Sequence, residues 1–113
     1  MSYESAFEIF EAAGRDGAAR KFSFKKAGTL AAGDRPELYF FDEYGAELIV
    51  CISGEALDHW QRAHRYLSRE EKIDVAGMFL KTKIEGTERL AADKLVIGAS
   101  ELGRILELLG IHA

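Results

Sequence analysis

Residues 38–52 read LYFFDEYGAELIVCI, and this stretch decides the fold of the chain. Two strand-like runs, Leu38–Phe41 and Glu47–Ile52, flank the tetrapeptide Asp42-Glu43-Tyr44-Gly45. Asp at the first position and Gly at the fourth are typical of a type I turn, so the stretch predicts a β-hairpin. The uninterrupted apolar run from Leu48 to Ile52 also indicates a central strand that is covered on both faces.

The residues before the hairpin predict a helix and a strand. Apolar side chains recur at helical spacing at Tyr3, Ala6, Phe7, Phe10 and Ala13. Residues 3–13 are therefore expected to form an amphipathic helix. From Lys21 to Lys26, two phenylalanines alternate with polar residues, which is typical of a half-buried strand. The segment from Ala27 to Pro36 is the candidate for a longer loop.

The residues after the hairpin carry helix-start signals. Ser53 is expected to cap one helix. Ser68 and Glu71 have the spacing of a capping box, which indicates that a second helix begins there. Residues 78–85 fit the end of that helix or a strand equally well.

A short strand, Leu95–Ile97, and a last helix capped by Ser100 complete the expected elements. Their order is α-β-β-β-α-α-β-α. We therefore expect an α+β fold, with a mostly antiparallel sheet of three to four strands packed with four helices. The length of 113 residues is typical of a single domain, here 1–113.

The composition excludes several classes of protein. Hydrophobic residues make up 48% of the chain, which is too many for intrinsic disorder. The longest apolar run has five residues, whereas a membrane-spanning helix needs about 20. The single Cys excludes an internal disulfide, and the first residues lack the features of an export signal. A cytoplasmic protein without membrane contact is the expectation.

The formal net charge of −4 is unevenly distributed along the sequence. Seven acids and one base lie between Asp34 and Asp58, whereas five bases and one acid lie between Arg15 and Lys26. Such blocks can become surface patches that bias which partner approaches, or they can be ordinary solvated faces.

The stretch 47–57, ELIVCISGEAL, is followed by Arg62-Ala63-His64-Arg65, a second charged helix and the closing run Lys94–Ile97. This arrangement resembles a family of small bacterial proteins that is catalogued only as a domain of unknown function. Its members have a hairpin, an "ISxEAL" helix, a "RAHR"-like segment, a second helix and a closing strand. The resemblance covers roughly residues 37–98. It implies an α+β fold and no particular activity.

A catalytic or metal site has little support in the sequence. Cys51 could be a nucleophile with His59 or His64 as its base, but it lies in the most apolar run, where burial disfavours the thiolate. The two histidines are five residues apart, so they do not share a helix face. Cys51 and His64 are therefore expected to be structural, and we predict no catalytic residue, no metal and no cofactor.

Basic side chains recur at steps of three and four at Arg62, Arg65, Arg69 and Lys72. If the two helices were continuous, these residues would form a ridge that grips phosphates or an acidic protein face. The capping box at Ser68 argues against that continuity. The aromatic residues around Tyr39 could stack on bases, but core packing of the sheet is the preferred interpretation.

These observations favour a non-catalytic small bacterial protein that binds another macromolecule, with a protein as the preferred partner, in a regulatory or inhibitory role. Arg62, Arg65, Arg69 and Lys72 are the candidate contact residues, and the terminal helices are a candidate homodimer contact. One alternative is a nucleic-acid accessory protein that uses the same basic residues. The other is a small enzyme or ligand carrier with a pocket near Cys51.

Overall fold

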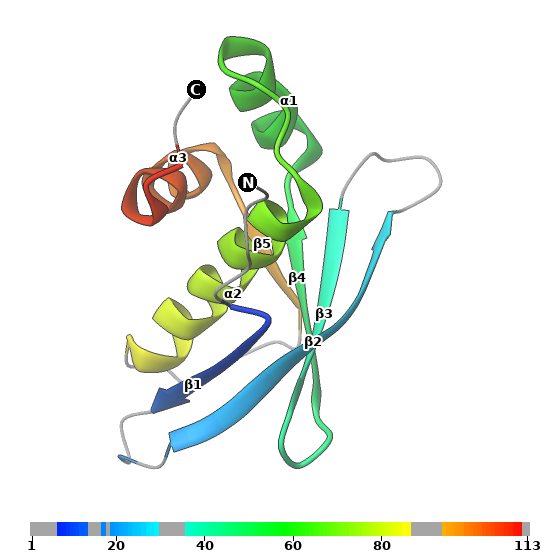
Figure 1. Ribbon diagram of the computed structural model, residues 1–113, viewed down its shortest axis with the longest axis vertical. Coiled ribbons are helices and arrows are strands. Elements are labelled where there is room, and N and C mark those ends of the chain that lie inside the picture. Colours follow the sequence, from blue (N-terminus) through cyan, green and yellow to red (C-terminus); the bar gives the residue numbers. More distant parts are fainter. Residues whose placement is uncertain (1–6, 14–16, 18, 30–35, 87–93, 112–113) are drawn as a thin grey trace.

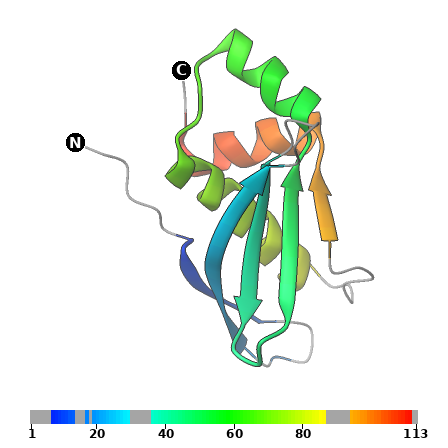
Figure 2. The same cartoon turned by 90° about the vertical axis from the view of Figure 1, so that its right-hand side faces the viewer.

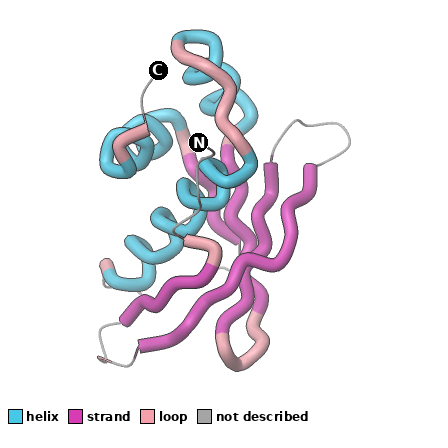
Figure 3. The backbone as a smooth tube through the Cα atoms, viewed as in Figure 1, coloured by secondary structure: helices cyan, strands magenta, loops and turns pink. Residues whose placement is uncertain are grey.

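The computed structural model describes residues 7–13, 17, 19–29, 36–86 and 94–111. The five strands are β1 (Ile9–Ala13), β2 (Ala19–Thr29), β3 (Pro36–Asp42), β4 (Glu47–Ile52) and β5 (Lys94–Ile97). They form one curled sheet in the order β1-β2-β3-β4-β5 (Figures 1 and 3). The first four strands are antiparallel neighbours, and β5 runs parallel to β4.

Three helices complete the described fold: α1 (Gly54–Ala63), α2 (Arg69–Glu85) and α3 (Ala99–Leu109). α2 and α3 lie on one side of the sheet, and α1 lies beyond the end of β4 (Figures 1 and 2). The core forms between α2, α3 and alternate residues of the strands, of which Phe22, Phe40 and Val50 are fully buried. The described part of the chain is therefore a two-layer α+β structure.

The expected fold class is wrong in its element count and order. The described residues contain five strands and three helices in the order β-β-β-β-α-α-β-α, and the sheet is mixed. β5 runs parallel to β4 because the connection through α1 and α2 crosses over the sheet, so that β5 starts at the same end as β4. Residues 78–85, which the sequence left undecided, belong to α2.

The expected helix over residues 3–13 is replaced by a strand in its described part, because Ile9–Ala13 is β1; residues 1–6 lie outside the described residues. Within β1 the burial has a period of two, because Phe10 and Ala12 are buried whereas Ile9 and Glu11 are exposed. Phe10 pairs with Phe22 across the two strands, and their rings stack at 5.4 Å. Pairing with β2 satisfies the backbone, so tertiary context decides between two patterns that are locally possible.

The predicted loop between Ala27 and Pro36 begins later than expected. Ala27–Thr29 extends β2, and Pro36 already belongs to β3, while residues 30–35 lie outside the described residues. β2 has 11 residues because a bulge between Phe24 and Lys26 lets it follow the curl of the sheet.

Most of the predicted local signals are confirmed. The amide of Gly45 donates to the carbonyl of Asp42 at 3.0 Å in the hairpin turn, and Gly45 has φ +88°. Ser53 caps α1, and Ser68 and Glu71 form the complete capping box of α2. The cap of α3 is different from the prediction, since Gly98 occupies the N-cap position and Ser100 lies inside the helix.

The residue Phe7, just before β1, lies close to α2. The amide of Phe7 donates to Oδ1 of the fully buried Asp74 at 2.9 Å. A Cβ atom on Gly77, one turn further along α2, would lie 2.5 Å from Cβ of Phe7. Glycine is therefore needed at position 77 for this segment to cross the helix.

Candidate interaction surface

The sheet has one face that no described helix covers, and we call it the open face (Figure 2). It is formed by the alternate strand residues whose side chains point away from the helices. By strand register, its accessible members are Ile9, Glu11, Lys21, Ser23, Lys26, Tyr39, Phe41, Glu47, Ile49 and Val96.

The middle of the open face is apolar. Tyr39, Phe41 and Ile49 are partly buried there, and Val96 at the β5 side is 49% exposed. At the opposite side, Ile9 on β1 is 59% exposed. Large apolar side chains that gather on one accessible face are characteristic of interaction sites.

Charged groups surround Tyr39 on this face. Nζ of Lys26 lies 4.8 Å from the centre of the Tyr39 ring, and the phenol donates to Oε1 of Glu37 at 3.3 Å. The pKa of Tyr39 is raised above its usual 10.0 by desolvation, by Glu37 and by Glu47. Tyr39 therefore keeps its phenol proton, which it donates to Glu37, while Lys26 on β2 contacts its ring.

One end of the same face is closed. Glu37 is 6% exposed and Cys51 is fully buried, although their side chains are on the side of the sheet without described helices. Sγ of Cys51 lies 3.4 Å from Oε2 of Glu37 and donates to it. A buried thiol lacks the solvent access of a reactive cysteine, and an adjacent carboxylate disfavours its thiolate form. The prediction that Cys51 is a core residue is confirmed.

The sequence prediction that the β4 run is covered on both faces needs a correction. Leu48, Val50 and Ile52 face the helices and are buried. On the opposite side, Cys51 is buried but Ile49 is only partly buried. The aromatic stretch divides in the same way, because Phe40 is in the core whereas Tyr39 and Phe41 lie on the open face.

The basic residues Arg62, Arg65, Arg69 and Lys72 do not form a continuous ridge, because the chain turns between α1 and α2. Arg62, on α1, pairs with Asp58 at 3.0 Å, and both side chains are exposed. Arg69 and Lys72 lie in the first turn of α2, where the Arg69 guanidinium is 5.3 Å from the Phe24 ring.

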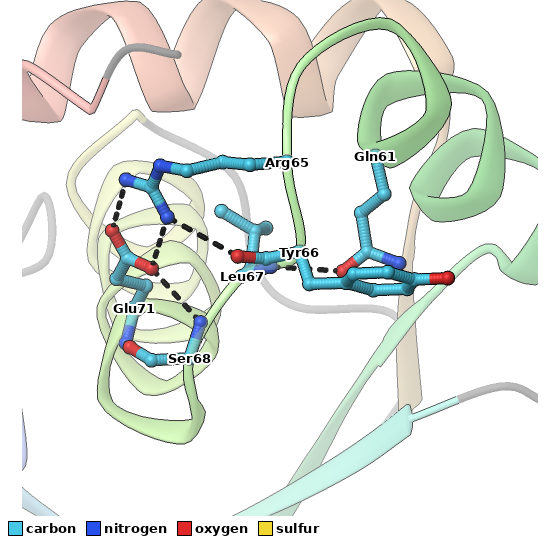
Figure 4. Close-up of polar contacts among 6 residues, drawn as sticks. All are labelled: Gln61, Arg65, Tyr66, Leu67, Ser68 and Glu71. Carbon is cyan, nitrogen blue, oxygen red and sulfur yellow. Dashed lines mark hydrogen bonds and ion pairs between the residues drawn. The ribbon is translucent and has the colours of Figure 1, made fainter.

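Arg65 is engaged in the turn itself (Figure 4). Its guanidinium donates two hydrogen bonds to the carboxylate of Glu71, at 2.9 and 2.8 Å, and a third to the carbonyl of Tyr66 at 3.2 Å. Glu71 also accepts from the amide of Ser68, and Gln61 accepts from the amide of Leu67 at 3.0 Å. These bonds fix the path of the chain between the two helices.

The ion pair between Arg65 and Glu71 shifts the pKa of both side chains. The bond from Arg65 lowers the pKa of Glu71 from 4.5 to about 2, and the hydrogen bond from Ser68 acts in the same direction. The same bond raises the pKa of Arg65. Arg65 is thus a structural cation in this state, which weakens its prediction as a contact residue.

The histidines are separated as predicted. His64 ends α1, its ring stacks on Trp60 at 4.3 Å, and its Nδ1 lies 2.9 Å from the Trp60 carbonyl oxygen. His59 lines an open hollow of about 540 Å³ together with residues that include Glu55, Arg62 and Ala99. Neither Cys51 nor His64 lines that hollow, so it gives no support to the alternative of a site near Cys51. Among the described residues, no three side chains of the metal-binding types lie close together.

The predicted homodimer contact through two terminal helices also needs a correction, because the described part of the expected first helix is the strand β1. The open face is what the sequence reasoning missed. The alternation of Leu38 and Phe40 with Tyr39 and Phe41 was a usable signal. It assigns these residues to two faces of one strand, but it does not tell which face the helices cover.

Comparison with known proteins identifies no relative. No protein-family model matches the chain, and neither a curated protein nor a solved structure matches it. The resemblance to the bacterial family of unknown function therefore stays a prediction. In the part of the chain that the structure describes, no helix combines the length and the apolar character needed to cross a bilayer.

Proposed function

We propose that this protein is a non-catalytic binding protein whose contact surface is the open face of its sheet. The observation that carries the proposal is the placement of Tyr39, Phe41 and Ile49, which form an accessible apolar centre on the face without described helices. Aromatic side chains with a polar end are favoured at the centre of protein interfaces. A regulatory or inhibitory role is one form that such binding can take.

The charges around this centre favour a protein over a nucleic acid. Two exposed lysines, Lys21 and Lys26, share the open face with two exposed glutamates, Glu11 and Glu47. A surface with this balance gives little net attraction to phosphates. The basic residues Arg62 and Arg65 already pair with carboxylates, so the nucleic-acid alternative has less support.

The alternative of an enzyme or ligand carrier near Cys51 also has less support. Its thiol is buried, and the hollow beside α1 is lined by other residues. A ligand site of that kind would need a pocket with polar groups that converge on it.

Site-specific photo-crosslinking tests the proposal. p-Benzoylphenylalanine would replace Phe41 on the open face, and in a matched control it would replace Leu108, which is 65% exposed on α3. The proposal expects protein adducts in cells that express the Phe41 probe and few from the Leu108 probe. Mass spectrometry would identify the adducts.

Two results would contradict the proposal. One is an equal yield of adducts from both positions, which would mean that the open face has no preferred contact. The other is a Phe41 adduct that nuclease treatment removes, which would indicate a nucleic-acid partner.

A further inference from the structure

We infer that the partner of the open face is a second copy of this chain. The inference rests on the proposed function and adds the identity of the occupant. It is carried by three side chains on neighbouring strands: Lys26 on β2 lies opposite Tyr39 on β3, and Glu47 on β4 lies opposite Phe41, one residue row further along. Lys26 contacts the Tyr39 ring from one side, and the field of Glu47 reaches the phenol from the other.

This arrangement is self-complementary. A twofold symmetric interface brings the same patch of both copies together, so each feature must match its symmetry mate. If the twofold axis runs along β3 above Tyr39, it places β2 of one copy over β4 of the other. Lys26 then lies one residue row from Glu47 of the second copy, a distance that a long lysine side chain can span to form an ion pair. The twofold symmetry repeats this ion pair on the other side of the axis.

The same axis brings the apolar residues together. Tyr39 and Phe41 lie on β3, so they meet the equivalent residues of the second copy near the axis, and Ile49 lies beside them. Sheets that pack face to face bury such rows of alternate residues between them. The charges beside the axis then favour this pairing, because Lys26 of each copy approaches Glu47 of the other.

A charge exchange tests this geometry, because each reversal breaks the pairing and the combination restores it. Sedimentation equilibrium in the micromolar range would measure the dimer dissociation constant. We expect the wild-type chain to dimerise, and we expect Lys26→Glu or Glu47→Lys alone to weaken the dimer by about tenfold or more, since each creates two like-charge contacts. The double variant Lys26→Glu/Glu47→Lys should return to within about threefold of wild type.

A matched pair of reversals controls for net charge. Arg104→Glu and Glu107→Lys are at exposed positions of α3, away from the open face, and should leave the dissociation constant unchanged. Thermal unfolding of every variant would show that it folds. Because both tested residues are exposed, the midpoint of thermal unfolding should stay close to that of the wild-type chain.

The outcomes separate this inference from the proposed function. A monomeric wild-type chain, or a dimer that neither reversal weakens, overturns the second-copy inference. Failure of the double variant to recover overturns the pairing of Lys26 with Glu47. If the Phe41 probe still captures a different protein, the open face remains a binding surface with another occupant. Adducts of twice the mass of the chain support the second copy.

Discussion

The two faces of the same sheet differ in almost every physical respect. On β3, Leu38 and Phe40 point toward the helices and are no more than 2% exposed. Tyr39 and Phe41 alternate with them, point the other way and remain partly accessible. On the helix-covered face, phenylalanine rings contact one another at 5.4 to 5.9 Å. On the open face, the Tyr39 ring contacts Lys26 and its phenol donates to Glu37.

The comparison teaches that one aromatic run can serve two purposes. Neighbouring residues of the same type contribute to folding or to recognition according to which side of the strand they occupy. Stability should depend on the helix-covered face, and association on the open face.

The largest expected effect comes from the pair Phe40 and Phe41. Phe40→Ala should lower the free energy of unfolding by about 3–5 kcal/mol, because it opens a cavity among Phe10 and Phe24. Phe41→Ala should lower it by only about 1 kcal/mol, since the ring is not fully buried. Urea unfolding of both variants would measure the difference. Equal losses would mean that the two faces contribute equally to stability.

The next largest effect on stability is expected at Glu71, at the start of α2. Glu71→Gln removes the charged partner of Arg65 and should cost about 2 kcal/mol of unfolding free energy near neutral pH. Because the folded pKa of Glu71 is lowered to about 2, its contribution is complete above pH 4.5 and is lost as the pH falls toward 2. The difference in unfolding free energy between wild type and variant should therefore become smaller as the pH falls from 4.5 toward 2.

Unfolding curves measured across this pH range would check the prediction. A gap that is independent of pH would show that the carboxylate charge is not responsible. Dimerisation at neutral pH should be unaffected, since Glu71 belongs to the helix layer and not to the open face.

The smallest expected effects on stability come from two glycines within helices, Gly77 in α2 and Gly103 in α3. Gly77→Ala should destabilise the protein by about 1 kcal/mol, because the new methyl group meets Phe7 and this overpacking exceeds the gain in helix propensity. Gly103→Ala in α3 meets no atom within 4 Å and should instead stabilise by up to about 1 kcal/mol. Shifts of the same sign in thermal unfolding would contradict the close approach at Gly77.

The sequence predicts those elements whose signals are local. The hairpin around Gly45, the caps at Ser53 and Ser68 and the strand Glu47–Ile52 depend on neighbouring residues, and all are confirmed. The segment Ile9–Ala13 could not be assigned in this way. Its apolar residues are compatible with either periodicity, and pairing with β2 decides in favour of a strand.

The contact surface was harder to predict for a related reason. Periodicity places Tyr39 and Phe41 on one side of a strand, but which side the helices cover depends on the whole topology. The basic residues illustrate the opposite error, since their spacing is regular along the sequence while the turn at Arg65 separates them in space. Local spacing is informative only within one continuous element.

The order of the strands has a consequence for how the chain folds during synthesis. Each of the first four strands pairs with the strand that precedes or follows it directly, so these contacts need only short loop closures. β5 pairs with β4 only after both α1 and α2 have been made. We therefore expect the antiparallel strands to assemble first on the nascent chain, and the parallel strand to complete the sheet last.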